Sequence, residues 1–359
     1  MRWLTGWVII SFCSVLVSCS PAVAPSPVLS PDTAALSQRV IDEAVPATDS
    51  PGCAAAVGAS GIVTWHGARG LADVEAGVAI SESTVFDIGS VSKQFTATMI
   101  LLLAADGKLA LNDPVSDHID GLPDWGDEVT ISQLVHQVSG IPEYIRLLEG
   151  KGHELEDAVG RDVAFAAIAE VKQLQFIPGA AFVYSNSNYL LLGYVIEQVT
   201  GERLADVLAS RIFRPLGLEL VMAPTVRVPG KARSYRFAGS EYEIADWRWD
   251  AAGAGGIQSR LADLVTWADN YRTGKLGGPG LLQAQIADAV EVGESGGGRY
   301  GAGIAVMPDG SLWHTGEYGG FHTLFRVSAD RSGVLVVACN LAWINIEELG
   351  VKLAEIWRI

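Results

Sequence analysis

The segment from Ser90 to Asp106 constrains the fold of this chain more than any other. It begins Ser-Val-Ser-Lys and continues as the strongly apolar run Gln-Phe-Thr-Ala-Thr-Met-Ile-Leu-Leu-Leu-Ala-Ala, which ends before Asp106 and Gly107. Apolar side chains in this pattern cover nearly the whole circumference of a helix. We therefore expect a helix over 90–106, closed by Gly107 and buried in the middle of the fold.

The start of this helix carries the residues with the most informative chemistry. A free serine is a weak nucleophile and needs a group that takes its proton. Residues three apart are neighbours on a helix, so Lys93 Nζ can reach Ser90 Oγ. Gly89 permits a tight turn into the helix, and the positive end of the helix dipole favours an alkoxide and disfavours a protonated Lys93. The pair indicates nucleophilic catalysis, although Ser-x-x-Lys by itself also arises by chance.

A second polar motif, Tyr184-Ser185-Asn186, follows a Pro-Gly turn and precedes an apolar helix. Tyr184 can act as a phenolate base if nearby cations lower its pKa. Asn186 can donate a hydrogen bond to Lys93 or to a substrate carbonyl. Taken alone, the motif has a structural explanation, in which Ser185 or Ser187 caps the helix and the tyrosine packs.

A third motif, His314-Thr315-Gly316, is expected on a strand or at the end of one. The backbone N–H of Ser90 and one just past Gly316 can then form an oxyanion hole. Without the other two motifs, His314 would be interpreted as a surface histidine.

The remaining pattern predicts an α+β fold in which a mostly helical insert, about 108–225, interrupts a region of helices and strands. Thr130-x-x-Gln133 matches a capping box at the start of one helix in the insert. Late strands joined by short turns favour an antiparallel sheet flanked by helices, with the active site at the seam. The first helix, 33–45, is expected to have Leu36, Val40, Ile41 and Val45 on one face. The expected strands are 52–58, 61–68, 71–75, 300–307, 311–315, 321–328 and 333–341, and the other expected helices are 163–174, 188–200, 203–213, 260–272 and 346–358.

The N-terminus has the features of a targeting segment. Arg2 precedes an apolar run that is too short and irregular to favour a spanning helix. It ends in Leu16-Val17-Ser18-Cys19, which resembles the lipobox of bacterial lipoproteins. That resemblance implies a signal peptide over 1–18, lipidation of Cys19, and a Pro/Ser-rich tether over 19–32. The alternative is an ordinary secretory peptide that is cleaved at Ala22 or Ala24.

Two further cysteines, Cys53 and Cys339, lie in apolar runs that resemble strands. In an exported protein they are either buried free thiols or a single disulfide between the first and last strands of the sheet, and spacing alone does not decide. Cys-x-x-Cys and His-Glu-x-x-His patterns are absent and the six histidines are scattered, so we expect no metal site and no cofactor. The formal net charge of −16 argues against nucleic acid as a partner.

The order of the three motifs around a helical insert resembles the penicillin-recognising serine hydrolases. These include class C β-lactamases, D-alanyl-D-alanine carboxypeptidases, and related esterases and D-aminopeptidases. The resemblance covers a domain over 33–359 and extends to the runs 134–142 and 254–259. It implies a β-lactamase/transpeptidase-like fold. It also implies the site residues: Ser90 as the acylated nucleophile, and Lys93 and Tyr184 in proton transfer with the base left open. The expected substrate-binding residues are Asn186, His314, Thr315, Gly316 and Glu317, the last four of them on the third-motif strand.

Two positions depart from the family pattern. Class C β-lactamases have lysine where this chain has His314, and a neutral imidazole attracts a substrate carboxylate less than an ammonium does. Glu317 stands where the family usually has a small residue. If its side chain faces the cleft, it repels carboxylates and favours neutral or cationic substrates; if it faces solvent, it has no such effect.

The resemblance implies a cell-envelope hydrolase whose substrate is a small molecule or peptide with an amide or ester carbonyl. We expect a D-alanyl-D-alanine carboxypeptidase or related peptidase first. A carboxylesterase and a class C-like β-lactamase are the enzymatic alternatives, because one fold and one set of catalytic groups serve several chemistries. An envelope scaffold or binding module is the non-enzymatic alternative. By its lipid anchor the protein would lie on the periplasmic face of a membrane, the outer one in a host with two membranes.

Overall fold

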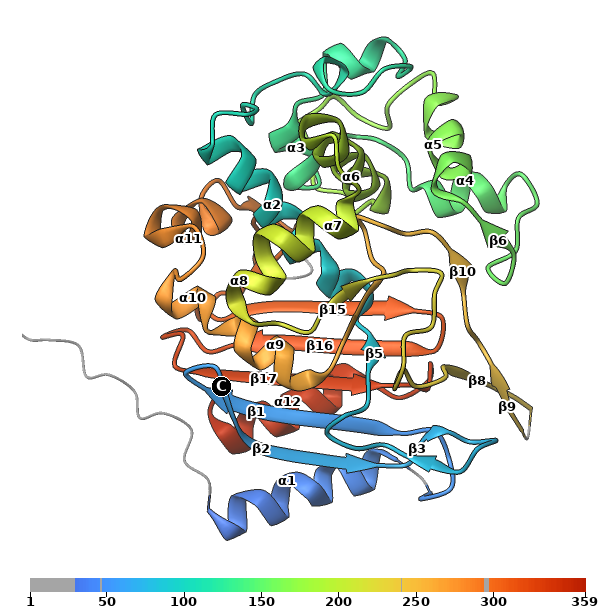
Figure 1. The fold of residues 1–359 in the computed structure, drawn as a ribbon, viewed down its shortest axis with the longest axis vertical. Helices are drawn as coiled ribbons and strands as arrows, with labels where there is room; N and C mark the ends of the chain where they lie inside the picture. Colours follow the sequence, from blue (N-terminus) through green and yellow to red (C-terminus); the bar gives the residue numbers. More distant parts are fainter. Residues whose placement is uncertain (1–29, 46, 240, 294–296) are drawn as a thin grey trace, which may run out of the picture.

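A computed structural model describes residues 30–45, 47–239, 241–293 and 297–359, in which helices cover both faces of an antiparallel sheet (Figure 1). Within this part of the chain, eight strands form the sheet in the order β12-β13-β14-β15-β16-β17-β1-β2. The first strand of this sheet thus lies beside the last one, β17, and β2 follows it at the edge. The strands are β1 (Cys53–Ala59), β2 (Ile62–Arg69), β12 (Val290–Glu291), β13 (Arg299–Tyr300), β14 (Ala305–Val306), β15 (Leu312–Tyr318), β16 (Phe321–Val327) and β17 (Gly333–Cys339).

The central strands are buried on both faces, which explains why they are apolar without alternation. In β1, Ala54 and Ala56 pack into one core, and Cys53, Ala55 and Val57 pack into the other. β17 divides in the same way between the two cores. A sheet of this kind requires helices on each side, and the chain supplies them from distant segments.

One face is covered by α1 (Pro31–Ala44) and α12 (Ile346–Trp357) from the two ends of the chain. Ser37 and Ile41 are the buried residues of α1, and Trp357 Nε1 of α12 donates a hydrogen bond to Ser37 Oγ (2.9 Å). The prediction that Leu36 shares this face is wrong, because Leu36 is 45% exposed. The inward stripe of α1 includes a serine, which the apolar pattern could not identify.

The opposite face carries the helix expected over 90–106. It starts as a 3-10 turn, Gly89–Ser92, and continues as α2 (Lys93–Ala105). Every residue from Lys93 to Leu103 is buried, so the predicted burial in the middle of the fold is confirmed. α9 (Leu261–Ala268) packs beside it against β1 and β17.

The mostly helical region lies above β15 in Figure 1. The predicted capping box is present there, with Thr130 and Gln133 bonded reciprocally. With the sheet, this region gives the expected β-lactamase/transpeptidase-like α+β fold. Its helices are α3 (Ile131–Val135), α4 (Tyr144–Glu149), α5 (Arg161–Ala169), α6 (Asn186–Thr200), α7 (Leu204–Leu208), a π-helical turn (Ala209–Phe213) and α8 (Arg214–Leu216).

Some elements differ from the expectation. The single strand predicted over 300–307 is instead the two short strands β13 and β14, because the chain turns between them at Gly303, whose φ is +75°. The hairpin of β8 (Tyr235–Ala238) and β9 (Glu241–Ile244) and the helices α10 (Asn270–Thr273) and α11 (Gly278–Ile286) complete the larger elements. The smaller strands are β3 (Leu71–Asp73), β4 (Val78–Ala79), β5 (Phe86–Asp87), β6 (Ala158–Val159), β7 (Val221–Met222), β10 (Arg248–Trp249) and β11 (Ile257–Ser259).

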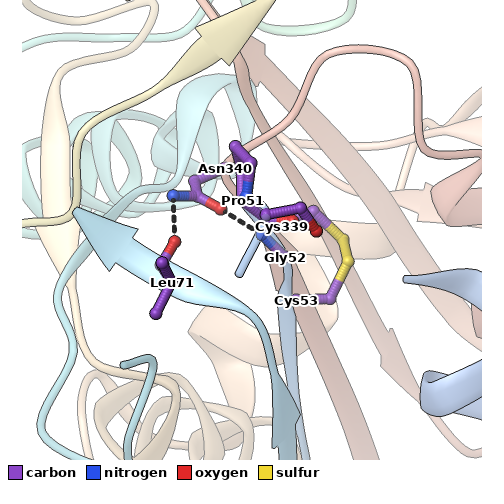
Figure 2. The surroundings of a disulfide bond; sticks show 7 residues. Pro51, Gly52, Cys53, Leu71, Cys339 and Asn340 are labelled. Carbon is purple, nitrogen blue, oxygen red and sulfur yellow. Dashed lines mark hydrogen bonds between the residues drawn. A yellow bond between two sulfur atoms is a disulfide. The ribbon is translucent and has the colours of Figure 1, made fainter. Parts of the chain in front are cut away.

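Cys53 and Cys339 form a disulfide that joins β1 to β17 (Figure 2). They are directly opposite each other in the sheet register. Beside the disulfide, Asn340 accepts a hydrogen bond from Gly52 N (2.7 Å) and donates one to Leu71 O (3.0 Å). Of the two alternatives that the spacing left open, the structure therefore has the bridged one.

Cys19, the signal peptide over 1–18 and most of the tether over 19–32 lie outside the described residues. None of the helices in the described ranges combines the length and the apolar character that crossing a membrane requires.

Candidate active site

Ser90 and Lys93 meet at the junction of the 3-10 turn and α2, as their spacing predicts. Lys93 Nζ lies 2.9 Å from Ser90 Oγ. It also donates hydrogen bonds to Asn186 Oδ1 (2.7 Å) and to the carbonyl oxygen of Ala254 (2.8 Å). Three neighbouring oxygens therefore fix the amine beside the hydroxyl.

The environment of Lys93 favours the neutral amine. Its side chain is fully buried, and burial lowers the pKa of Lys93 from that of an ordinary amine to about 7. Nearby Glu143 opposes this effect by favouring the ammonium. An amine with this pKa can accept the proton of a serine at neutral pH.

The loop around Ala254 is tied to the same helix. Thr96 Oγ1 of α2 donates a hydrogen bond to Gly253 O (2.8 Å), and Ile257 N donates one to Ser92 Oγ (3.2 Å). The run 254–259 therefore supplies the backbone carbonyl oxygen of Ala254 that holds Lys93. The sequence did not predict this contact, because it involves a backbone atom and no side chain of the run.

Gln137 holds the loop that carries the second motif. Its side-chain Oε1 accepts a hydrogen bond from Ser185 N (3.0 Å), and its backbone oxygen accepts one from Val183 N (3.1 Å). Gln137 has a φ of +62°, which is uncommon for a residue with a side chain. Neither serine side chain caps α6: Ser185 makes no capping hydrogen bond, and the Ser187 hydroxyl donates to Pro142 O.

Glu143 is a residue of this site that the sequence did not identify. Its Oε2 accepts hydrogen bonds from Asn186 N (2.7 Å) and Asn186 Nδ2 (3.0 Å). This fixes the orientation of the Asn186 amide, so that Oδ1 faces Lys93. Burial raises the pKa of the Glu143 carboxyl, while its hydrogen bonds from Asn186 and Ile145 oppose the rise. Glu143 directly follows the run 134–142, but nothing in the spacing connects it to Asn186.

Tyr184 remains a protonated phenol in this structure. Burial raises the pKa of Tyr184 well above 10, and the neighbouring Ser90 hydroxyl only partly opposes the rise. The ring packs against Tyr300 and His314, with centroids 6.1 and 6.3 Å away. The condition under which Tyr184 could act as a phenolate base, a pKa lowered by nearby cations, is therefore not met, because burial and the neighbouring Tyr300 raise its pKa. Lys93, whose nitrogen is 4.9 Å from the ring centroid, is the better base.

β15 approaches the turn before Ser90 backbone to backbone. A Cβ on Gly316 would lie 2.0 Å from Ile88 O and 3.0 Å from Ser90 N, and a Cβ on Gly89 would lie 2.5 Å from Glu317 N. Only glycine at both positions permits this approach. It places the backbone nitrogen of Ser90 close to the backbone of Gly316 and Glu317, which is where the sequence predicts an oxyanion hole.

His314 is buried and neutral, not a surface residue. Its Nδ1 lies 2.5 Å from Thr315 O, which can only accept, so Nδ1 carries the proton. Nε2 then accepts from the Tyr300 hydroxyl at 3.2 Å. Burial, together with nearby Lys93, lowers the pKa of His314 to about 3. The imidazole therefore provides no charge for a substrate carboxylate.

A cavity of about 630 Å³ opens at Ser90. Most of the predicted site residues line this cavity, namely Ser90, Tyr184 and the whole run from His314 to Glu317. Lys93 lies behind Ser90, outside this lining. Glu317 lines the cavity and yet has a side chain that is 65% exposed, so it stands at the rim.

A second, smaller hollow of about 40 Å³ lies on the other side of Ser90. Its walls include Asn186 and the aromatic residues Tyr144, Trp247, Trp249 and Tyr318, and Glu317 also borders it. Ser90 and Glu317 thus stand between the two spaces. This aromatic wall was not predicted from the sequence, because its residues come from three separate segments.

A serine beside a buried amine of lowered pKa, set between an antiparallel sheet and a helical region, defines a serine hydrolase. The model of the family described as Beta-lactamase matches residues 38–342. The chain therefore belongs to the beta-lactamase family.

Similar proteins include "Protein flp" of Staphylococcus aureus (strain MW2), which is 28% identical over 312 residues that cover 81% of this chain and 60% of that protein. The chain thus spans about 60% of the length of this protein and of its counterpart in another Staphylococcus aureus strain. Among solved structures, a D-stereospecific amidohydrolase from Streptomyces sp. has a TM-score of 0.76 and 24% identity, covering 90% of this chain and 98% of the other. SurE with D-Leu has a TM-score of 0.69 and 26% identity, with coverage of 90% and 74%.

Proposed function

We propose that this chain hydrolyses amide bonds in D-configured amino-acid derivatives or short peptides through an acyl-enzyme at Ser90. The observation that carries the proposal is the position of Lys93 Nζ, 2.9 Å from Ser90 Oγ, in surroundings that lower its pKa to about 7. Such an amine takes up a proton and returns it at neutral pH, which acyl transfer requires twice.

In the acylation step, Ser90 Oγ attacks the carbonyl carbon while Lys93 accepts the hydroxyl proton. The oxygen that gains negative charge is bound by the N–H groups of Ser90 and Glu317. Tyr184 donates its phenolic proton to the leaving nitrogen as the C–N bond breaks, and Lys93 replaces that proton. Water then attacks the ester with the proton transfers reversed, and releases the acid and free Ser90.

The D configuration is supported by SurE, a protein of the same fold that was solved with D-Leu. A D-alanyl-D-alanine carboxypeptidase would use the same steps and differ only in the group that leaves. Esters would react at the same site, because their leaving oxygen needs less help from a proton donor.

The test uses the full chain in mild detergent, with Ser90→Ala as the matched control. The amides and the p-nitrophenyl esters of N-acetyl-D-alanine and N-acetyl-L-alanine are compared, together with N-acetyl-D-alanyl-D-alanine, and fluorescent penicillin reports acylation by intact mass. We expect D-amide turnover at least about tenfold faster than L-amide turnover. We also expect an adduct that Ser90→Ala lacks.

Other outcomes identify other functions. Turnover of esters alone would indicate an esterase, and hydrolysis of penicillin a β-lactamase. A preference for L-amides would overturn the proposed configuration. If no compound is turned over and no adduct forms, the chain is a scaffold or binding module.

We also propose that Cys19 is lipidated and anchors the catalytic domain to the cell envelope through the tether over 19–32. The support is the run Leu16-Val17-Ser18-Cys19 and the Pro/Ser-rich composition after it. Several buried acyl chains give stable anchoring at about 0.8 kcal/mol per CH₂ group. Cys19→Ala should move the protein from the membrane to the soluble fraction, whereas Cys13→Ala, in the segment to be removed, should not. Retention of Cys19→Ala at the membrane would contradict lipidation.

A further inference from the structure

The large cavity beside Ser90 contains acidic groups and no cationic side chain. Among the described residues that line it there is no lysine and no arginine, whereas Glu317 and Glu347 are both present. Its two histidines do not compensate. Both nitrogens of His314 are engaged in hydrogen bonds, and burial lowers the pKa of His322 as well.

Glu317 lies close to the reacting atoms. A Cβ on Gly89 would lie 2.5 Å from Glu317 N, so the backbone of Glu317 runs directly beside the turn that carries Ser90, and its carboxylate is within one side-chain length of that turn. Side chains alternate along a strand, so Thr315 and Glu317 are on one face of β15. Within the described ranges, the Glu317 carboxylate has one partner of opposite potential charge within 4.0 Å, the cross-strand residue His322, at 3.8 Å.

The N-terminus of α12 does not reverse this polarity. Asn345, Ile346 and Glu347 line the cavity, and a helix N-terminus attracts anions. Here Asn345 Oδ1 accepts from Glu348 N (3.1 Å), and two carboxylates, Glu347 and Glu348, occupy the first turn. The carboxylates of Glu347 and Glu348 therefore already lie at this helix N-terminus, so it does not attract a substrate carboxylate.

The leaving group enters the large cavity. A leaving nitrogen needs a proton, and Tyr184, the donor proposed above, lines the large cavity and not the small aromatic hollow. The acyl part of the substrate therefore faces Trp247 and Trp249, and the departing part faces Glu317 and Glu347.

We infer that Glu317, with support from Glu347, makes the site reject leaving groups that end in a free carboxylate and favour neutral or cationic ones. This inference rests on the proposed acyl transfer at Ser90. It separates the chain from carboxypeptidases, whose leaving amino acid has a free carboxylate. The expected substrates are amides, internal peptide bonds, or conjugates with an amine that carries a further positive charge.

The test uses three phenyl esters of N-acetyl-D-alanine that carry a carboxylate, a carboxamide or an aminomethyl group at the meta position. Activated esters acylate a serine whether or not amides are cleaved, so the test does not depend on amide turnover. The rate of Ser90 acylation is measured for the full chain, Glu317→Gln and Glu347→Gln. Glu128→Gln serves as the control, since it removes an exposed acid outside the cavity. For each ester, the acylation rate of a variant is divided by that of the parent chain, so that the intrinsic reactivity of the ester cancels.

We expect Glu317→Gln to raise acylation by the carboxylate ester and to lower acylation by the aminomethyl ester, so that their ratio changes about tenfold. The rate with the neutral carboxamide ester is the reference for each variant, and Glu347→Gln should show a smaller change in the same direction. Equal changes for all three esters, or an unchanged ratio, would overturn the inference while leaving the proposed function intact. If no ester acylates Ser90, the proposed function fails and the inference fails with it.

Discussion

Asn186 donates two hydrogen bonds to one oxygen of Glu143, from its backbone nitrogen at 2.7 Å and from Nδ2 at 3.0 Å. With its amide nitrogen held in this way, Asn186 presents Oδ1 to Lys93 at 2.7 Å. Glu143 therefore acts on Ser90 through two other side chains without touching it, which makes it a positioning residue.

Glu143→Gln tests this role. The variant loses the charge that raises the pKa of Lys93, so the pH at which activity reaches half its plateau should decrease. Looser placement of Asn186 should also lower kcat, by up to about 100-fold, with little change in KM. The measurement is the pH profile of ester hydrolysis, with the thermal unfolding midpoint as a control for folding. A reduced rate with an unchanged pH profile would indicate a purely structural residue.

The pH dependence of the parent enzyme follows from Lys93. Its pKa of about 7 means that the ammonium dominates below pH 7 and the free amine above it. Only the free amine can accept the Ser90 proton, so kcat/KM should rise about tenfold per pH unit below pH 7 and level off above it. A neutral amide or ester is the appropriate substrate, because it does not titrate itself. His314, with a pKa lowered to about 3, contributes nothing in this range. A flat profile between pH 5 and 7 would exclude Lys93 as the base.

Tyr184→Phe separates proton donation from serine activation. The phenylalanine ring retains the packing against Tyr300 and His314, and only the hydroxyl is lost. Hydrolysis of an amide, whose nitrogen needs a proton, should fall about 100- to 1,000-fold. Acylation by a p-nitrophenyl ester should change little, because nitrophenolate leaves unprotonated. An equal fall for both substrates would show that Tyr184 acts before the leaving group departs.

Gly316→Ala should disrupt the oxyanion site. The added Cβ would lie 2.0 Å from Ile88 O, so the strand and the turn would have to separate. Loss of one oxyanion donor typically costs about 100- to 1,000-fold in kcat. Gly280→Ala is the matched control, since a Cβ there meets open space and the residue lies within α11. Acylation of Ser90 is the readout, and full activity in Gly316→Ala would refute a role for this close approach.

Much of the fold was predictable because its signals are local. The apolar circumference of the helix after Ser90 indicated burial, and the Thr130–Gln133 pair indicated a helix start; the structure has both. The three motifs were also close enough to known patterns for their convergence to be expected. Lys93 next to Ser90 follows from helical spacing alone.

The part of the site that could not be predicted from the sequence depends on contacts between distant segments. Glu143 and Asn186 are 43 residues apart, and the carbonyl of Ala254 that holds Lys93 is 161 residues from it. A backbone carbonyl has no sequence signature, and a single glutamate after a proline has many possible roles. Periodicity failed similarly at 300–307, where a turn at Gly303 divides an apolar run, and at Leu36, whose neighbour Ser37 is buried in its place.

Removal of the disulfide should lower stability without lowering activity. Cys53 and Cys339 are 286 residues apart, so their bond restricts the unfolded chain over most of its length. The double variant Cys53→Ala/Cys339→Ala should therefore lose about 3 kcal/mol in the free energy of unfolding. The bond joins β1 to β17, two strands from β15, so the rate of Ser90 acylation at 25 °C should be that of the parent.

Denaturant unfolding followed by tryptophan fluorescence gives the free energy of unfolding. A reductant present during unfolding should destabilise the parent to the level of the variant and leave the variant unchanged. Equal stabilities of parent and variant under oxidising conditions would show that the bond contributes nothing to the fold.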